Sequence, residues 1–164
     1  IPEKEREAVQ ALLDEYGLPT DQGISTLRRM EMACPALPLC PLAQSESERV
    51  MPEFMRGLEE AGHSDADVVI RMTGCPNGCA RSSTSEIGLI GKGPGRYVLL
   101  VGGAYNGTRL NTPLDEKVRH EEVVPLIASL LALWKQHRQP GERFGDWSYR
   151  TGVETLRKML GRTG

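Results

Sequence analysis

The chain has 164 residues, of which 39% are hydrophobic and 18 are glycine, an ordinary composition for one globular domain. No stretch approaches the roughly eighteen consecutive apolar residues of a membrane span, and no apolar signal segment opens the chain. We therefore expect a soluble, cytoplasmic protein. Because an initiator methionine is also missing, we expect residues 1–164 to be a single domain cut from a longer chain.

The net charge of −2 is distributed unevenly along the chain. Residues 1–69 hold 6 Lys/Arg against 14 Asp/Glu, whereas residues 70–110 hold 5 against 1, a local net charge of +4. A basic stretch inside a mildly acidic protein indicates an anionic ligand at that stretch rather than a nucleic-acid surface. The small number of aromatic residues also argues against base stacking.

Two helices are predicted in the first part of the chain. Residues 3–16 have the period of an amphipathic helix, whose apolar face we expect to pack against the body of the protein. A second helix is expected over residues 45–60, where Ser45 and Glu48 have the spacing of a capping box. Pro52 would kink this helix or mark its true start.

Short β-branched runs predict strands in the middle of the chain. Residues 68–70 form one such run, and residues 87–90 and 97–101 form two more. The glycine-rich segment 91–95 predicts a hairpin loop between the last two. Two further helices are expected, over residues 120–137 and 153–160. The fold class that follows is α+β, with a small antiparallel sheet and packed helices.

Four cysteines carry the strongest chemical signal: Cys34, Cys40, Cys75 and Cys79. Three of them precede a proline, which favours extended or turning backbone that can hold thiolates in place. An iron–sulfur cluster uses four thiolates and tolerates these spacings. Two disulfides, a structural zinc site and unliganded core cysteines are the alternatives, although five residues inside the first pair strain the usual zinc pattern.

The second cysteine pair suggests a helix N-terminus. With Cys75 as the N-cap and Pro76 in the first turn, residues 77–79 would offer free backbone N–H groups to an anionic cluster. Gly74 and Gly78 would let the backbone approach a bulky cofactor closely.

At these residues the chain resembles a known family. The run Met72-Thr73-Gly74-Cys75-Pro76-Asn77-Gly78-Cys79-Ala80-Arg81, with Cys34 and Cys40 upstream, is similar to the C-terminal cluster-binding region of siroheme-dependent sulfite reductases. The resemblance implies that the four cysteines hold a [4Fe–4S] cluster. It also implies that Cys79 bridges to the siroheme iron, and so has a catalytic role in the six-electron reduction of sulfite to sulfide.

The resemblance also suggests further cofactor contacts. Asn77 and Arg81 are the candidate siroheme-binding residues. Five basic residues are candidates to meet anionic groups, with surface or ion-pair roles as the alternative: Arg71, Arg81, Lys92, Arg96 and Arg109. Three methionines would form an apolar shell around the cluster or pack in the core: Met30, Met32 and Met72.

The partners expected from the resemblance are sulfite, an electron donor and the upstream part of the same reductase. The donor would be a flavoprotein subunit or a ferredoxin, and neither nucleic acid nor a membrane is expected. Siroheme nitrite reductase is the alternative enzyme, and a zinc-stabilised module without catalysis is the alternative from another class. Because one small α+β unit offers only one wall to a wide cofactor, we expect the isolated segment to be inactive.

Overall fold

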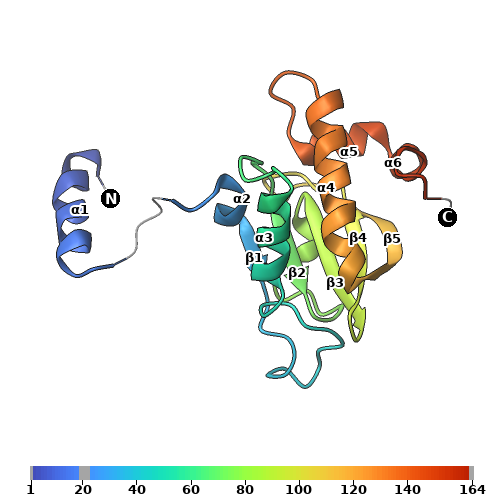
Figure 1. The fold of residues 1–164 in the computed structure, drawn as a ribbon, viewed down its shortest axis with the longest axis horizontal. Coiled ribbons are helices and arrows are strands. Elements are labelled where there is room, and N and C mark those ends of the chain that lie inside the picture. The colour runs from blue at the N-terminus through green and yellow to red at the C-terminus, as the bar shows by residue number, and fades with distance from the viewer. Residues whose placement is uncertain (1, 19–22, 163–164) are drawn as a thin grey trace.

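A five-stranded sheet forms the centre of the computed structural model, which describes residues 2–18 and 23–162 (Figure 1). The strands lie in chain order: β1 Glu31–Ala33, β2 Ile70–Thr73, β3 Ile87–Gly93, β4 Arg96–Val101 and β5 Thr112–Arg119. The pairs β1–β2 and β2–β3 are parallel, and the pairs β3–β4 and β4–β5 are antiparallel. The α+β class is confirmed, but the sheet is mixed rather than antiparallel.

The length of the connections explains the mixed sheet. Residues 34–69 join β1 to β2 and residues 74–86 join β2 to β3, and both segments are long enough to return the chain to the starting end of the sheet. Only the connection between β3 and β4 is a tight turn, and there the predicted hairpin is confirmed, with Ile87 opposite Val101. The strand predicted at residues 68–70 begins later, at Ile70.

Two helices, α3 (Met51–Glu60) and α4 (His120–His137), cover one face of the sheet (Figure 1). The α4 bounds are those predicted. The apolar stripes of both helices meet every second residue of β2, β3 and β4, as strand geometry requires. The largest fully buried side chains of this core include Phe54, Met55, Leu58, Ile70, Met72, Ile87, Leu89, Tyr97 and Leu99.

Helix α3 begins at Met51, later than predicted. Pro52 lies in its first turn, where the missing N–H costs nothing, so the proline marks the start of the helix. Ser45 is fully buried outside the helix, and the predicted capping box with Glu48 is wrong.

Three shorter helices complete the body: α2 Thr26–Arg29, α5 Phe144–Thr151 and α6 Val153–Met159. The last one confirms the helix predicted over residues 153–160. The sequence reading did not predict α2, α5, β1 or β5. No helix among the described residues is long and apolar enough to cross a membrane.

The N-terminal helix α1 (Arg6–Glu15) stands apart from the sheet (Figure 1). It forms where the sequence predicts, with a 3-10 turn at Glu3–Glu5 before it, but none of its residues is buried. Leu12 and Tyr16 of the expected apolar face are 53% and 72% exposed. The predicted packing against the body is therefore wrong, because amphipathic periodicity reports a face that can be buried and not what buries it.

Candidate functional site

The two cysteine pairs lie at one edge of the sheet because β1 and β2 are adjacent and parallel. Cys34 directly follows β1, and Cys75 follows β2 after a single glycine. The backbone N–H of Cys34 donates to the Met72 carbonyl at 3.1 Å, which extends the ladder. The Gly74 N–H donates to the Cys34 Sγ at 3.3 Å. This N–H···S contact joins the first cysteine to the backbone beside the third.

Two glycines let the loop that carries Cys34 and Cys40 lie flat against the sheet. A Cβ on Gly74 would lie 2.5 Å from the Ala36 Cβ, and a Cβ on Gly91 would lie 2.4 Å from the Gly74 carbonyl oxygen. The Gly74 carbonyl accepts hydrogen bonds from two successive loop N–H groups, those of Gln44 and Ser45, at 2.8 and 3.0 Å. No residue with a side chain fits at Gly74 or Gly91 without displacing this loop.

Further along the same loop, hydroxyl groups fix the backbone. The Ser47 hydroxyl donates to the Met72 carbonyl at 2.9 Å, and the Tyr97 hydroxyl donates to the Glu46 carbonyl at 3.1 Å. Burial raises the pKa of Tyr97, so the phenol keeps its proton for this bond at neutral pH. The loop is thus attached to both β2 and β4.

The segment after Cys75 differs from the prediction. Residues 75–80 form turns and not a helix, so Cys75 is not an N-cap and residues 77–79 do not form a helix N-terminus. The reason is local, because Gly78 has φ of 72° and Arg81 has φ of 53°, both in the left-handed region that ends a right-handed helix. The Arg81 N–H donates to the Gly78 carbonyl at 2.7 Å and closes the second turn.

All four cysteines are free thiols, and they differ in their exposure to solvent. Cys75 is buried, Cys34 and Cys40 are half-buried, and Cys79 is exposed. Among the described residues, no group of three or more His, Cys, Asp or Glu side chains is placed to hold a single metal ion. Cys34 and Cys75 follow the carboxyl ends of two adjacent parallel strands, and four thiols with an N–H···S contact are a donor set that suits an iron–sulfur cluster.

Two arginines flank the second cysteine pair in the sequence, and neither has an acidic partner among the residues that the structure describes. Arg71 is on β2, and the Arg81 charge lowers its pKa in addition to the larger effect of burial. The Arg71 Nε is buried without a hydrogen-bond partner. Neither arginine forms an ion pair with any residue that the structure describes. A pair of uncompensated guanidinium groups is a site for an anionic ligand.

The other predicted contacts fall into three groups. Lys92 pairs with Glu116, and Arg109 pairs with Asp146 and lies over the Tyr149 ring, so both are engaged in the ion-pair alternative. Arg96 and Asn77 are exposed. Met72 is fully buried in the core and Met32 is 41% exposed, so the three methionines, including half-buried Met30, do not form one shell.

The sequence reading missed a buried carboxylate at the end of the Cys79 segment. Glu86 is fully buried and accepts hydrogen bonds from the backbone N–H groups of Val69 and Gly145, both at 3.0 Å. Arg143 donates to both carboxylate oxygens, at 2.8 and 3.3 Å. Glu86 was visible as the single acidic residue of the basic stretch, next to a strand, and that was its only signal.

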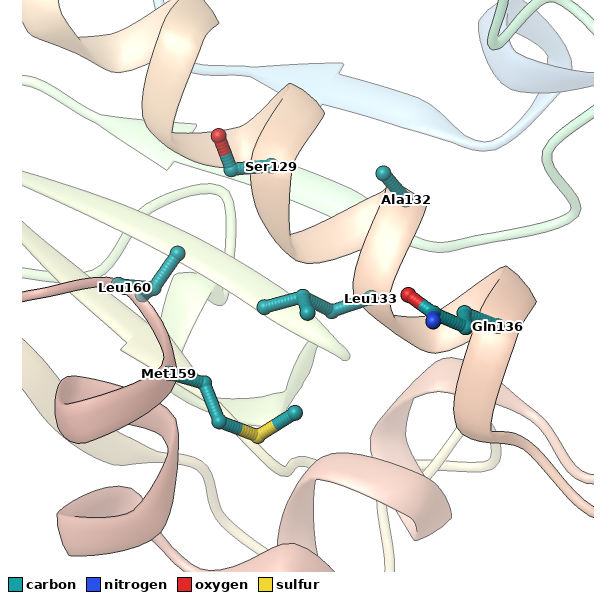
Figure 2. Close-up of a pocket in the computed structure, with 6 residues that line it drawn as sticks. All are labelled: Ser129, Ala132, Leu133, Gln136, Met159 and Leu160. Carbon is teal, nitrogen blue, oxygen red and sulfur yellow. The ribbon is translucent and has the colours of Figure 1, made fainter.

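A shallow pocket lies elsewhere, between α4 and α6 (Figure 2). Its volume is about 340 Å³, and its lining is Ser129, Ala132, Leu133, Gln136, Met159 and Leu160. The Ser129 hydroxyl already donates to the Pro125 carbonyl at 2.9 Å. The pocket lining contains no charged group, and its one hydroxyl is engaged by the helix backbone, so it does not compete with the cysteine edge as the functional site.

Comparisons with known proteins show the family of this chain. The family described as "Nitrite and sulphite reductase 4Fe-4S domain" matches residues 26–163. The sulfite reductase [NADPH] hemoprotein beta-component of a Methylorubrum extorquens strain is 48% identical over 156 residues, which are 93% of this chain and 25% of that protein. The corresponding protein of Staphylococcus haemolyticus is 44% identical over 93% of this chain and 27% of its own length. The chain thus spans about a quarter of these curated relatives.

Solved structures show the same fold. The Mycobacterium tuberculosis NirA protein superposes with a TM-score of 0.70 at 28% identity, over 96% of this chain and 31% of NirA. Dissimilatory sulfite reductase I has a TM-score of 0.66 at 13% identity, over 82% of this chain and 52% of that chain, and supports the fold alone. The family and the hemoprotein relatives imply a [4Fe–4S] cluster and siroheme as cofactors. The chain belongs to the nitrite and sulphite reductase 4Fe-4S domain family.

Proposed function

We propose that this chain forms the cluster-binding part of a sulfite reductase that reduces sulfite to sulfide with six electrons. The observation that supports this most directly is the contact between the two cysteine loops at the carboxyl ends of β1 and β2, where the Gly74 N–H donates to the Cys34 Sγ. Arg71 and Arg81, which flank the second loop in the sequence, form no ion pair with any described residue. The sulfite reductase relatives favour sulfite over nitrite as the substrate.

Within this proposal, Cys34, Cys40, Cys75 and Cys79 hold the cluster. The cluster and siroheme, when bound, would store and deliver the electrons for reduction of the bound anion. Cys79 is the exposed thiol of the four, which suits a residue that reaches a second cofactor outside the loop. We assign the bridge to the siroheme iron to Cys79.

Arg71 and Arg81 would hold the carboxylates of siroheme, and exposed Asn77 would add a neutral contact at the same surface. Burial of the Arg71 guanidinium strengthens its attraction for a carboxylate, because the local dielectric constant is lower than in water. The two charges repel each other until an anion lies between them. An anionic macrocycle therefore gains more here than a neutral one.

The rest of the active site would come from sequence outside this chain. The relatives are hemoprotein components about four times as long as their matching segment, and their names include NADPH. We propose a flavoprotein subunit that passes electrons from NADPH as the donor, in preference to a ferredoxin. We also propose residues 1–164 as one domain of the longer reductase, without turnover of its own.

Metal analysis tests the proposal most directly. After anaerobic reconstitution we expect about four iron and four sulfide ions per chain. One tightly bound zinc ion and no sulfide would instead support the zinc-stabilised module. For the substrate, specificity constants of the full-length enzyme should favour sulfite, and a marked preference for nitrite would overturn that assignment.

A further inference from the structure

The turn that follows Cys79 and Arg81 is held by one residue from a distant part of the chain. Residues 82–84 form a single 3-10 turn between the Cys79 segment and β3. Asn111 lies just before β5 and is far from this turn in sequence. Its side-chain amide donates to the Ser82 carbonyl at 2.6 Å and to the Ser85 carbonyl at 2.9 Å. Its backbone N–H donates to the Ser83 carbonyl at 3.0 Å.

The turn packs closely against two glycines beside this contact. A Cβ on Gly88 would lie 2.4 Å from the Ser82 carbonyl oxygen and 2.8 Å from the Asn111 amide nitrogen. A Cβ on Gly103 would lie 2.1 Å from the Ser85 carbonyl oxygen. The backbone of the turn therefore sits directly on two glycines, with the Asn111 amide inserted beside it.

Arg81 needs such support because its backbone is strained. A non-glycine residue with φ of 53° lies in the left-handed region, where a side chain is disfavoured. The Arg81 carbonyl accepts from the Thr84 N–H at 3.1 Å and from the Thr84 hydroxyl at 3.0 Å. The conformation of Arg81 is thus coupled to the turn that Asn111 holds.

We infer that Asn111 is a positioning residue for Arg81. By fixing the turn, it holds the left-handed backbone of Arg81, and with it the direction in which the Arg81 side chain leaves the chain, in the conformation that would meet an anion. The inference rests on the proposed function, in which that anion is a siroheme carboxylate. Asn111 itself does not touch the ligand in this assignment and acts only through Arg81.

The test measures siroheme affinity by absorbance titration of siroheme-free, full-length hemoprotein. We expect Asn111→Ala to weaken siroheme binding about tenfold, a change of the size that the loss of a buried hydrogen bond produces. Asn111→Asp keeps the shape but removes the N–H donors, and should weaken binding at least as much. Asn106→Ala is the matched control, because Asn106 bonds only within its own loop, to Thr108. Acid-labile sulfide and the melting temperature report on cluster content and folding.

A double-mutant cycle separates positioning from a general structural role. If Asn111 acts through Arg81, Asn111→Ala should cause no further loss of siroheme affinity in an Arg81→Ala background. In the cofactor-free protein, hydrogen exchange should speed up at residues 82–85 in Asn111→Ala and not in Asn106→Ala. Equal losses in both backgrounds, or wild-type affinity in Asn111→Ala, would overturn the inference. A wild-type protein that takes up neither cluster nor siroheme would instead overturn the proposed function.

Discussion

The helix-covered core and the cysteine edge of the sheet are ordered by different forces. In the core, α3 and α4 bury apolar side chains against β2, β3 and β4, and order follows from hydrophobic burial. At the edge, the cysteine loops are held by close backbone contact at Gly74 and Gly91 and by hydrogen bonds to the Gly74 carbonyl. The edge can therefore expose thiols and cations that the core could not accommodate.

Loss of a thiol should have the largest effect on function and little effect on the core. Cys79 is exposed, so Cys79→Ser in the full-length enzyme should leave folding intact while it abolishes sulfite reduction. Magnetic coupling between cluster and siroheme, measured by electron paramagnetic resonance, should disappear as well. Retained coupling would show that another residue forms the bridge.

The next largest effect is expected at the buried carboxylate that ends the Cys79 segment. Glu86→Leu leaves two backbone N–H groups without their acceptor and removes the buried one of the two carboxylates that pair with Arg143, so it should reduce the free energy of unfolding by about 3–5 kcal/mol. Chemical denaturation measures this change. Asp67→Asn is the control, because Asp67 is the exposed partner of the same arginine and should cost less than about 1 kcal/mol. Similar losses in both variants would show that burial of Glu86 is not what matters.

Glycine substitution at the edge should be costly where the loop touches the backbone. Gly74→Ala places a methyl group 2.5 Å from the Ala36 Cβ and 2.7 Å from the Ser45 carbonyl oxygen, so the loop must move. We expect a loss of about 1–3 kcal/mol in the free energy of unfolding and reduced cluster uptake. Gly57→Ala in α3 is the comparison, because the added methyl group meets the Val124 side chain rather than backbone. Alanine also has a higher helix propensity than glycine. If both variants load clusters equally, the contact is not essential.

The smallest expected effect is the contribution of His63 to the pH dependence of stability. Burial lowers the pKa of His63 from 6.5, and the Lys135 charge adds to this effect, so the unfolded chain takes up a proton before the folded chain does. Stability should therefore fall as pH drops below about 6.5, and His63→Gln should remove that part of the slope in pH-dependent denaturation. An unchanged slope would contradict this assignment.

Glu59 of α3 should also make stability depend on pH, but in a separate and more acidic range than His63. The Arg28 and Ser25 hydrogen bonds lower the pKa of Glu59 from 4.5 to about 2. Its stabilising contribution is present above about 4.5 and is lost as the pH falls toward 2. Glu59→Gln should leave the slope near pH 6 unchanged, which separates the two groups.

How far the sequence predicted the fold differs between the two regions. The core elements carry strong periodic signals, so α4 and the β3–β4 hairpin were predicted with nearly their observed bounds. β5 was missed because its sequence is mostly polar, contains Pro113, and buries only Leu114 and Val118. The parallel pairing of β1 with β2 was missed because it depends on tertiary contacts that no local pattern reports.

At the site, the cysteine motif predicted the ligand types but not the backbone that holds them. The turns at residues 75–80 replace the expected helix start because Gly78 and Arg81 take left-handed conformations, which the order of residues does not signal for an arginine. Asn111 was invisible for a similar reason. Its role depends on a contact between segments far apart in the chain. The assignments of the four cysteines, Asn77 and Arg81 remain predictions.

Tyr97 belongs to both regions at once. Its ring packs edge-on against Phe54 with centroids 6.2 Å apart, while its hydroxyl group holds the Glu46 carbonyl of the cysteine loop. A change in the volume of residue 54 would move the ring and so displace the loop. Substitutions at positions 54 and 97 are therefore not free to accumulate independently during evolution, and across homologues the sizes of these two side chains should covary.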